Sequence, residues 1–211
     1  MTTNDKQPHW EKVYTLKGEG EVSWFQETPA PSLELLERLG IRPAAAIIDV
    51  GGGTSRFVDC LLARGFENIT VLDLSEAALA VARARLGNAG ETVKWIVADA
   101  TKWHPRQAYD LWHDRAAFHF LTHEQDQQAY IQRLKHSLRR GGHAIIGTFA
   151  VDGPETCSGL PVVRHSATSL STLLGDDFVL VDSRHHEHVT PWKSVQRFQF
   201  GTFRYRINRE L

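Results

Sequence analysis

The chain has few cysteines, no long apolar run and no excess of charge of either sign. Cys60 and Cys157 are its only cysteines, which excludes a disulfide framework and is typical of the reducing cytoplasm. Residues 1–8 lack the apolar core of a signal peptide, and no later run reaches membrane length. With 24 basic and 25 acidic side chains, no long-range field favours nucleic acid or a membrane surface. We therefore expect one cytoplasmic domain over residues 1–211, without membrane contact.

The most informative segment is residues 47–55, Ile-Ile-Asp-Val-Gly-Gly-Gly-Thr-Ser. It predicts a buried parallel strand that opens into a loop of bare backbone, before a helix that starts near Arg56. A dinucleotide loop needs its third glycine where Arg56 stands, and a P-loop needs a Gly-Lys-Ser/Thr ending that is absent here. Asp49 would repel a pyrophosphate and suits a cationic ligand. S-adenosylmethionine, with a sulfonium and an ammonium group, is such a ligand.

Three further strands also end in polar side chains. Residues 68–74 place Asp73 about 20 residues beyond the glycines, where an acid accepts hydrogen bonds from ribose hydroxyls. Residues 93–100 place Asp99 where it could accept a hydrogen bond from an adenine amino group, and residues 109–114 end in a polar cluster. Because ligands of open α/β sheets bind at the carboxyl ends of the strands, we expect the four strand ends to line one crevice.

The order of the elements predicts an α/β fold. After an amphipathic helix at residues 32–39, strands and helices alternate over residues 44–149, which implies a parallel sheet with right-handed crossovers. A short helix is expected after residue 98, and two glycines at 141–142 are expected to break the chain before the fifth strand. Strands at 178–189 and 195–207 lie close enough in sequence to pair antiparallel.

On these residues the chain resembles the class I S-adenosylmethionine-dependent methyltransferases, over residues 10–207. The run 49–55 looks like their first motif, with Ser55 in place of the usual last glycine. Asp73 matches the ribose-binding acid and residues 99–100 match the adenine-side motif. The glycine variant, followed by residues 72–76, is most similar to the branch of small-molecule methyltransferases and of the protein-lysine methyltransferases of elongation factor and citrate synthase.

The resemblance implies a Rossmann-like, doubly wound sheet of seven strands, mostly parallel with an antiparallel last strand. It implies S-adenosyl-L-methionine as the cofactor. Together with the charges discussed above, it predicts a cofactor site formed by Trp10, Tyr14, Trp24, Asp49, Gly51, Gly52, Gly53, Ser55, Arg56, Asp73, Leu74, Asp99, Ala100 and His113.

Methyl transfer from a sulfonium is an in-line displacement with an electrophile that is already activated, so the enzyme chiefly aligns the reactants. No metal is expected: on a strand, His186 and His188 share a face, but two ligands do not complete a zinc site. An acceptor that arrives protonated needs a base, and His113 and Asp114 at the end of the fourth strand are the catalytic candidates. The alternative is that Asp114 caps the following loop.

Two segments are expected to cover the site. Residues 1–26 are aromatic-rich and are predicted to form a lid over the methionine end of the cofactor, where aromatic faces attract a sulfonium. The alternative is an apolar flap that completes the core. Residues 151–165 are predicted to form an acceptor-side loop. Arg56 could pair with the carboxylate of the cofactor, or be solvated.

A missing motif narrows the class of methyl acceptor. Enzymes of this fold that methylate amino groups of nucleic acids carry Asn/Asp-Pro-Pro-aromatic after the fourth strand, whereas residues 113–116 are His-Asp-Arg-Ala. Nucleic acid is therefore disfavoured, and a small molecule or a protein lysine is the predicted acceptor. The alternative to an enzyme is a catalytically silent S-adenosylmethionine-binding module, which would keep the cofactor pocket for folding or for contact with a partner. No oligomeric state is predicted.

Overall fold

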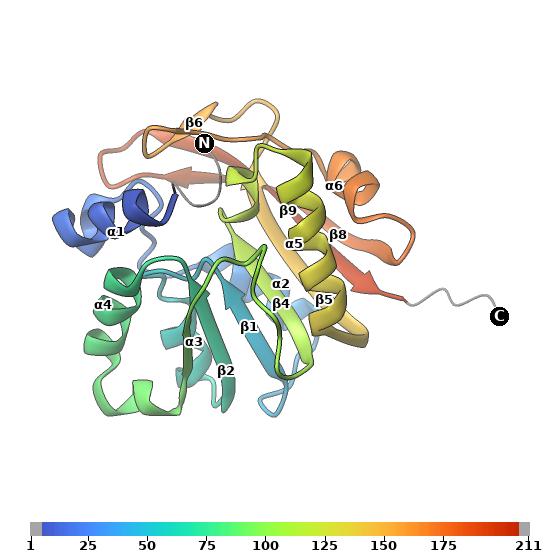
Figure 1. Ribbon diagram of the computed structural model, residues 1–211, viewed down its shortest axis with the longest axis horizontal. Coiled ribbons are helices and arrows are strands. Elements are labelled where there is room, and N and C mark those ends of the chain that lie inside the picture. Colours follow the sequence, from blue (N-terminus) through green and yellow to red (C-terminus); the bar gives the residue numbers. More distant parts are fainter. Residues whose placement is uncertain (1–5, 207–211) are drawn as a thin grey trace.

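The computed structural model describes residues 6–206, which form a seven-stranded sheet with helices on both faces (Figure 1). The strands of the sheet are β1 (Ala46–Val50), β2 (Asn68–Asp73), β3 (Lys94–Val97), β4 (Tyr109–Arg115), β5 (Leu138–Phe149), β8 (Phe178–Val189) and β9 (Val195–Tyr205). The helices are α1 (Lys6–Leu16), α2 (Ala30–Arg38), α3 (Phe57–Ala63), α4 (Glu76–Leu86), α5 (Glu124–Ser137) and α6 (Ala167–Leu174). Three 3₁₀ turns, η2 (Glu19–Glu21), η3 (Gly87–Thr92) and η4 (Phe118–Phe120), and a hairpin of β6 (Thr156–Cys157) and β7 (Leu160–Pro161) complete the list.

The strand order is β3-β2-β1-β4-β5-β9-β8. Strands β1 to β5 pair in parallel, and β9 is antiparallel to both of its neighbours, β5 and β8. This arrangement confirms the predicted fold class, including the reversed last strand. Residues 1–5 of the predicted lid and residue 207 of the predicted last strand lie outside the described residues.

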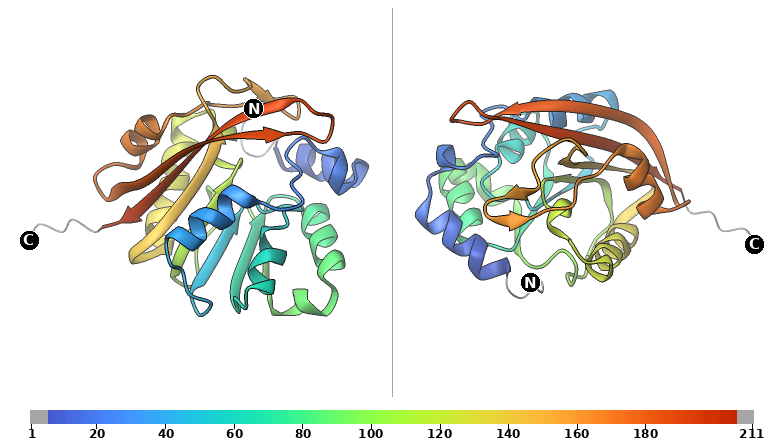
Figure 2. Two further views of the ribbon diagram at one scale, coloured as in Figure 1. Left: turned by 180° about the vertical axis from the view of Figure 1, so that it is seen from behind. Right: turned by 90° about the horizontal axis from the view of Figure 1, so that it is seen from above.

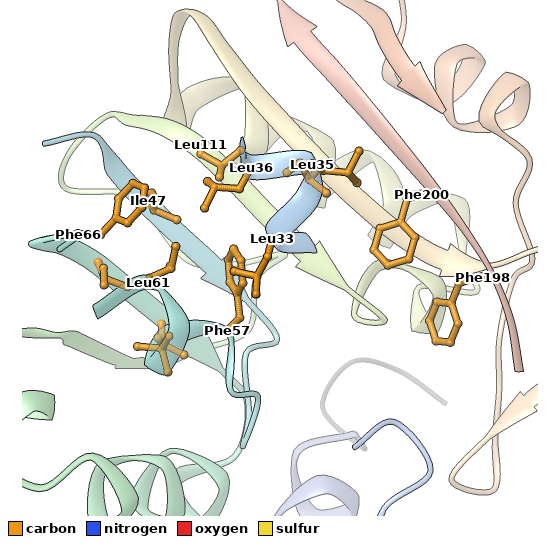
Figure 3. Packing of buried hydrophobic residues seen from close by; sticks show 14 of the residues in the cluster. Leu33, Leu35, Leu36, Ile47, Phe57, Leu61, Phe66, Leu111, Phe198 and Phe200 are labelled. Carbon is orange, nitrogen blue, oxygen red and sulfur yellow. The ribbon is translucent and has the colours of Figure 1, made fainter. Parts of the chain in front are cut away.

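The alternation of side chains along the strands divides the core into two layers. Ile47 points to the layer under α2, α3 and α4, while Ile48 points to the layer under α5 and α6. Helices α5 and α6 face the viewer in Figure 1, and α2 and α3 face the viewer in the left view of Figure 2. Figure 3 shows Leu33 and Leu36 of α2 among the buried side chains of the first layer.

The register brings the ends of the parallel strands to one edge of the sheet. Asp49 of β1 lies beside His113 of β4, and Asp73 of β2 lies beside Val97 of β3. Helix α1 lies beside this edge (Figure 1). The polar ends of the four strands are therefore neighbours, as the sequence predicted.

The first segment of the chain differs from the prediction. No helix was predicted for residues 1–26 from the sequence, but α1 spans Lys6–Leu16. Trp10, Val13 and Tyr14 share one face and pack against the core, with Trp10 also in contact with Phe120. The fourth large apolar side chain of the helix, Leu16, is exposed, so the apolar period is weak and tertiary packing rather than propensity stabilises this helix.

Two local expectations were also wrong. The glycine pair at 141–142 does not precede the fifth strand, because α5 ends at Ser137 and β5 begins at Leu138. Gly141, at φ 81°, instead lies where the register between β4 and β5 shifts, since glycine tolerates the backbone of a bulge. The short helix expected after residue 98 is a hydrogen-bonded turn over residues 99–103 that stops before Pro105.

Of the helices in the described part of the chain, none combines the length and apolar character needed to cross a lipid bilayer.

Candidate functional site

A cavity lies at the edge of the sheet where the parallel strands end, and it has two adjoining chambers. The large chamber contains about 840 Å³ of space and the small chamber about 470 Å³, both with their open mouths included. Trp10, Tyr14, Trp24, Asp73, Asp99 and Cys157 are among the residues that line the large chamber. Gln26, Asp49, Gly52, Ser55, Arg56 and His113 are among those that line the small chamber. Tyr14, Trp24, Gly51 and Arg115 line both.

The glycine loop lets three elements approach one another closely. A Cβ on Gly53 would lie 2.7 Å from the Tyr14 hydroxyl of α1, and one on Gly52 would lie 2.8 Å from Asp49 Oδ2. Gly51 and Gly53 also have φ values of 67° and 51°, which favour glycine. Bare backbone therefore forms this part of the wall, as the sequence predicted.

Asp73 is a buried carboxylate in the wall of the large chamber. It ends β2, where Oδ1 accepts a hydrogen bond from Ser75 N at 2.8 Å and the backbone of Gly53 also bonds the carboxylate. Burial raises the pKa of Asp73 to about 6, and these backbone donors offset only part of that effect. A ligand with hydroxyl donors would stabilise the charged form.

Asp99 lies at the other side of the large chamber, together with Ala100 and with Leu74. Its Oδ1 accepts hydrogen bonds from the backbone N and the hydroxyl of Thr101, at 2.8 and 2.7 Å. Lys102 Nζ lies 3.5 Å from Oδ2. The turn after β3 therefore fixes this carboxylate in the wall.

His113 is held at both ring nitrogens. Nδ1 lies 2.6 Å from Asp49 Oδ1, Nε2 lies 2.8 Å from Ser32 Oγ, and the ring stacks on Phe57 at 4.0 Å. The histidine is 1% exposed although it borders the small chamber. Its buried chain of contacts joins β1, α2 and β4, and a role as a base, which would need Nε2 to leave Ser32, stays a prediction.

Asp114 caps the turn after β4. It accepts hydrogen bonds from the backbone N of Ala117 at 2.9 Å and of Phe118 at 3.1 Å, and from the Tyr130 hydroxyl at 2.6 Å. It lines neither chamber and is fully buried, which raises its pKa to about 6. This geometry is the capping alternative left open above, and a catalytic role for Asp114 stays a prediction.

Arg56 precedes α3 and borders the small chamber. Its guanidinium pairs with Glu27 at 2.8 Å and with Glu19 at 3.3 Å, so it is not merely solvated. The buried Nε atom has no hydrogen-bond partner among residues 6–206. Ser55 beside it accepts a hydrogen bond from Phe57 N at 3.1 Å, which starts the helix.

Two cations of the cavity wall were not assigned from the sequence. Arg115 Nη1 donates to the Trp24 carbonyl at 2.9 Å, while burial lowers its pKa to about 10. Lys6 Nζ donates to the Phe120 carbonyl at 2.6 Å, and burial lowers its pKa as well. Arg115 follows the polar cluster at the end of β4, which could have indicated it. No pattern in the sequence indicated Lys6.

Helix α1 is also tied to the start of α4. Glu11 accepts hydrogen bonds from the Ser75 hydroxyl at 2.7 Å and from Ala77 N at 3.1 Å. The negative charge stands at a helix N-terminus, where it is stabilised by the unpaired backbone N–H groups. The helix that roofs the large chamber therefore contacts the element that begins just after Asp73.

On the opposite side, the predicted acceptor-side loop contains the β6–β7 hairpin, which brings Cys157 to the wall of the large chamber. Burial raises the pKa of the Cys157 thiol to about 11, so the thiol is protonated near neutral pH.

The polar groups of the chambers fit the predicted cofactor. Gln26 Oε1 and Arg56 Nε are buried, border the small chamber and have no partner in the described chain. They offer one acceptor and one donor, which match the ammonium and carboxylate of an amino-acid group. Asp73 in the large chamber offers acceptor oxygens to a ribose. Among residues 6–206 no group of three or more His, Cys, Asp or Glu side chains could hold a metal ion.

Comparison with known proteins agrees with the geometry. Residues 47–142 match the family described as "Methyltransferase domain". Trans-aconitate 2-methyltransferase of Variovorax paradoxus is 36% identical over 119 residues, which cover 55% of this chain and 43% of that protein. EEF1A lysine methyltransferase 2 of Danio rerio is 27% identical over 65% of this chain and 66% of that protein. The chain thus spans less than half the length of the first of these relatives.

A solved structure shows the same fold. The 1,6-didemethyltoxoflavin-N1-methyltransferase of Burkholderia thailandensis, with bound S-adenosylhomocysteine, superposes with a TM-score of 0.76 at 22% identity. The superposition covers 98% of this chain and 91% of that one. With the strand order, this likeness shows that the chain has the fold of the class I S-adenosylmethionine-dependent methyltransferases, and together with the matched segment it confirms the resemblance found in the sequence.

Proposed function

We propose that the chain binds S-adenosyl-L-methionine across the two chambers and transfers its methyl group to a small-molecule acceptor. The observation that carries the proposal is the distribution of polar groups in the cavity wall: the acidic acceptor Asp73 in the large chamber, and an unpaired acceptor and an unpaired donor, Gln26 Oε1 and Arg56 Nε, in the small one. Bound there, S-adenosylmethionine supplies an activated methyl group on a sulfonium.

The residues of the cavity have distinct tasks in this proposal. Asp73 accepts hydrogen bonds from the ribose hydroxyls, and Asp99, Ala100 and Leu74 border the adenine. Arg56 and Gln26 hold the amino-acid group in the small chamber. Such positioning supplies much of the catalysis when the electrophile is already activated.

The aromatic side chains of α1 and of the segment after it exclude water. Trp10 contacts Trp24 at 5.6 Å and Phe120 at 4.9 Å, and Tyr14 contacts Trp24 at 6.1 Å, all as edge-on pairs. They form a rigid apolar roof over the large chamber. Their faces also attract a sulfonium. The roof supports the prediction that this segment forms a lid.

The small-molecule acceptor is supported by the covered large chamber and by the relative named for trans-aconitate. A protein lysine is the second candidate, because the Danio rerio relative, a lysine methyltransferase by name, matches 65% of this chain.

Calorimetry with S-adenosylmethionine and S-adenosylhomocysteine, in the presence of a chelator, tests the first step. We expect binding of both, and none of a nicotinamide dinucleotide. Methyl transfer is then followed with labelled cofactor on a lysate that is split into small-molecule and protein pools. Label in the small-molecule pool supports the proposal, label on protein supports the second candidate, and binding without transfer to either pool indicates the silent module.

A further inference from the structure

We propose that Arg115 binds a carboxylate of the methyl acceptor, so that the acceptor is an organic acid. This inference rests on the proposed function, because it concerns the acceptor of the same site. It starts from a charge in the cavity wall that the protein itself does not neutralise.

Arg115 differs from the other arginines near the chambers in its partners. Arg56 pairs with two glutamates, and Arg85 pairs with Asp59 at 2.7 Å and with Glu19. Arg115 forms no ion pair within residues 6–206: Nη1 donates to a backbone carbonyl, and Nη2 is buried without a partner. Asp49, an acid on the neighbouring strand, is bonded to His113 instead.

Arg115 is part-buried, and leaving its buried Nη2 atom unpaired is costly; an anion bound there would offset that cost. The guanidinium keeps its proton near neutral pH, since its pKa is lowered only to about 10. The carbon of the guanidinium lies 5.2 Å from the centre of the Phe198 ring, which holds its plane in place. A fixed guanidinium fork is the geometry that binds a carboxylate through two hydrogen bonds.

The position of Arg115 assigns the carboxylate to the acceptor and not to the cofactor. Arg56 and Gln26 border the small chamber alone and already offer a donor and an acceptor to an amino-acid group. Arg115 borders both chambers and is bonded to the carbonyl of Trp24, which also borders both. Lys6 borders the large chamber alone and Arg56 the small chamber alone, so Arg115 is the charged donor that borders both and can face the space left beside the proposed cofactor.

The test is calorimetry of succinate, tricarballylate and trans-aconitate, each compared with its neutral methyl ester, on protein with and without S-adenosylhomocysteine. We expect the acids to bind and the esters to bind weakly or not at all. Arg115→Gln should weaken acid binding at least about tenfold, the value of one charge-assisted hydrogen bond, and Arg115→Lys should weaken it less. The matched control is Arg139→Gln, an exposed arginine that pairs with Asp110 away from both chambers.

Two further ligands test whether Arg115 binds the carboxylate of the acceptor or that of the cofactor. S-adenosylhomocysteine carries a carboxylate, and methylthioadenosine lacks the amino-acid group. We expect Arg115→Gln to change the affinity for neither. If it weakens S-adenosylhomocysteine but not methylthioadenosine, the carboxylate belongs to the cofactor and the inference is overturned.

The inference is also overturned if wild-type protein binds acids no better than esters, or if Arg115→Gln binds the acids as wild type does. The comparison of acid with ester in wild-type protein needs no variant, so a variant that fails to fold does not prevent the decision. Failure of wild-type protein to bind S-adenosylhomocysteine would instead overturn the proposed function, and the acid and ester titrations of the unliganded protein would still decide the carboxylate site.

Discussion

Replacement of Asp73 by Asn tests the cofactor site most directly, because it removes one charge and leaves the shape. The amide oxygen of Asn can still accept the hydrogen bond from Ser75 N, so the start of α4 should be kept. What is lost is the charged acceptor in the wall of the large chamber. We therefore expect a large loss of S-adenosylhomocysteine affinity without a loss of fold.

The size of the loss follows from the bonds that a carboxylate makes to ligand hydroxyls. A hydrogen bond to a charged group contributes about 1.5–3 kcal/mol, so loss of one raises the dissociation constant about 10- to 150-fold. The variant should not be less stable than wild type above pH 6. Burial raises the pKa of Asp73 in the folded chain to about 6. The pKa of an Asp in an unfolded chain is about 3.9. The charged form of Asp73 therefore destabilises the unliganded protein by on the order of 3 kcal/mol at most.

The pH dependence of stability and of ligand affinity gives a second test of the role of Asp73. Because the pKa of Asp73 is raised by folding, its favourable contribution to stability is complete below about pH 4 and is lost as the pH rises through about 6. Ligand hydroxyls stabilise the charged form, so affinity should be highest above pH 6 and fall as the pH drops below it. Asp114 has a similar raised pKa, and Asp73→Asn separates the two, since only Asp73 lines the chamber.

The assay is calorimetry of S-adenosylhomocysteine at several pH values, with thermal unfolding of the unliganded proteins as the control for folding. An unchanged dissociation constant in Asp73→Asn would mean that Asp73 only caps α4, and the proposed orientation of the cofactor would be wrong. A variant that loses affinity but keeps the pH dependence of wild type would assign that dependence to another group.

Three further changes probe the residues around the chambers. His113→Ala leaves Asp49 buried without its partner, so urea unfolding should show a free energy of unfolding lower by about 3–5 kcal/mol. Unchanged stability together with slower methyl transfer would identify His113 as a base. Asp114→Ala should lower the free energy of unfolding by about 2 kcal/mol and leave S-adenosylhomocysteine affinity in calorimetry unchanged. Glu11→Gln should speed hydrogen exchange in residues 6–16 and weaken the ligand several-fold, whereas unchanged exchange would show that packing alone holds α1.

The strands and their polar ends could be predicted because they depend on local patterns. Residues 68–73 form β2 as expected, since an apolar run that ends in an acid is visible in one short window. The contact of Asp49 with His113 could not be predicted, because it requires β4 to be the neighbour of β1. The order of strands in a sheet is a property of the whole chain and not of any window.

The same reasoning explains why the two cations of the wall were missed. Lys6 donates to Phe120, 114 residues further along, and Arg115 donates to Trp24, 91 residues before it. No local sequence pattern indicates either hydrogen bond, and a lysine near a terminus is ordinarily solvated. Lys6 is buried and Arg115 is part-buried, and the hydrogen bonds of both go to backbone carbonyls, so their charges cost the unliganded fold stability. A group that costs stability and lines a cavity is better explained by what the cavity binds than by what the fold needs.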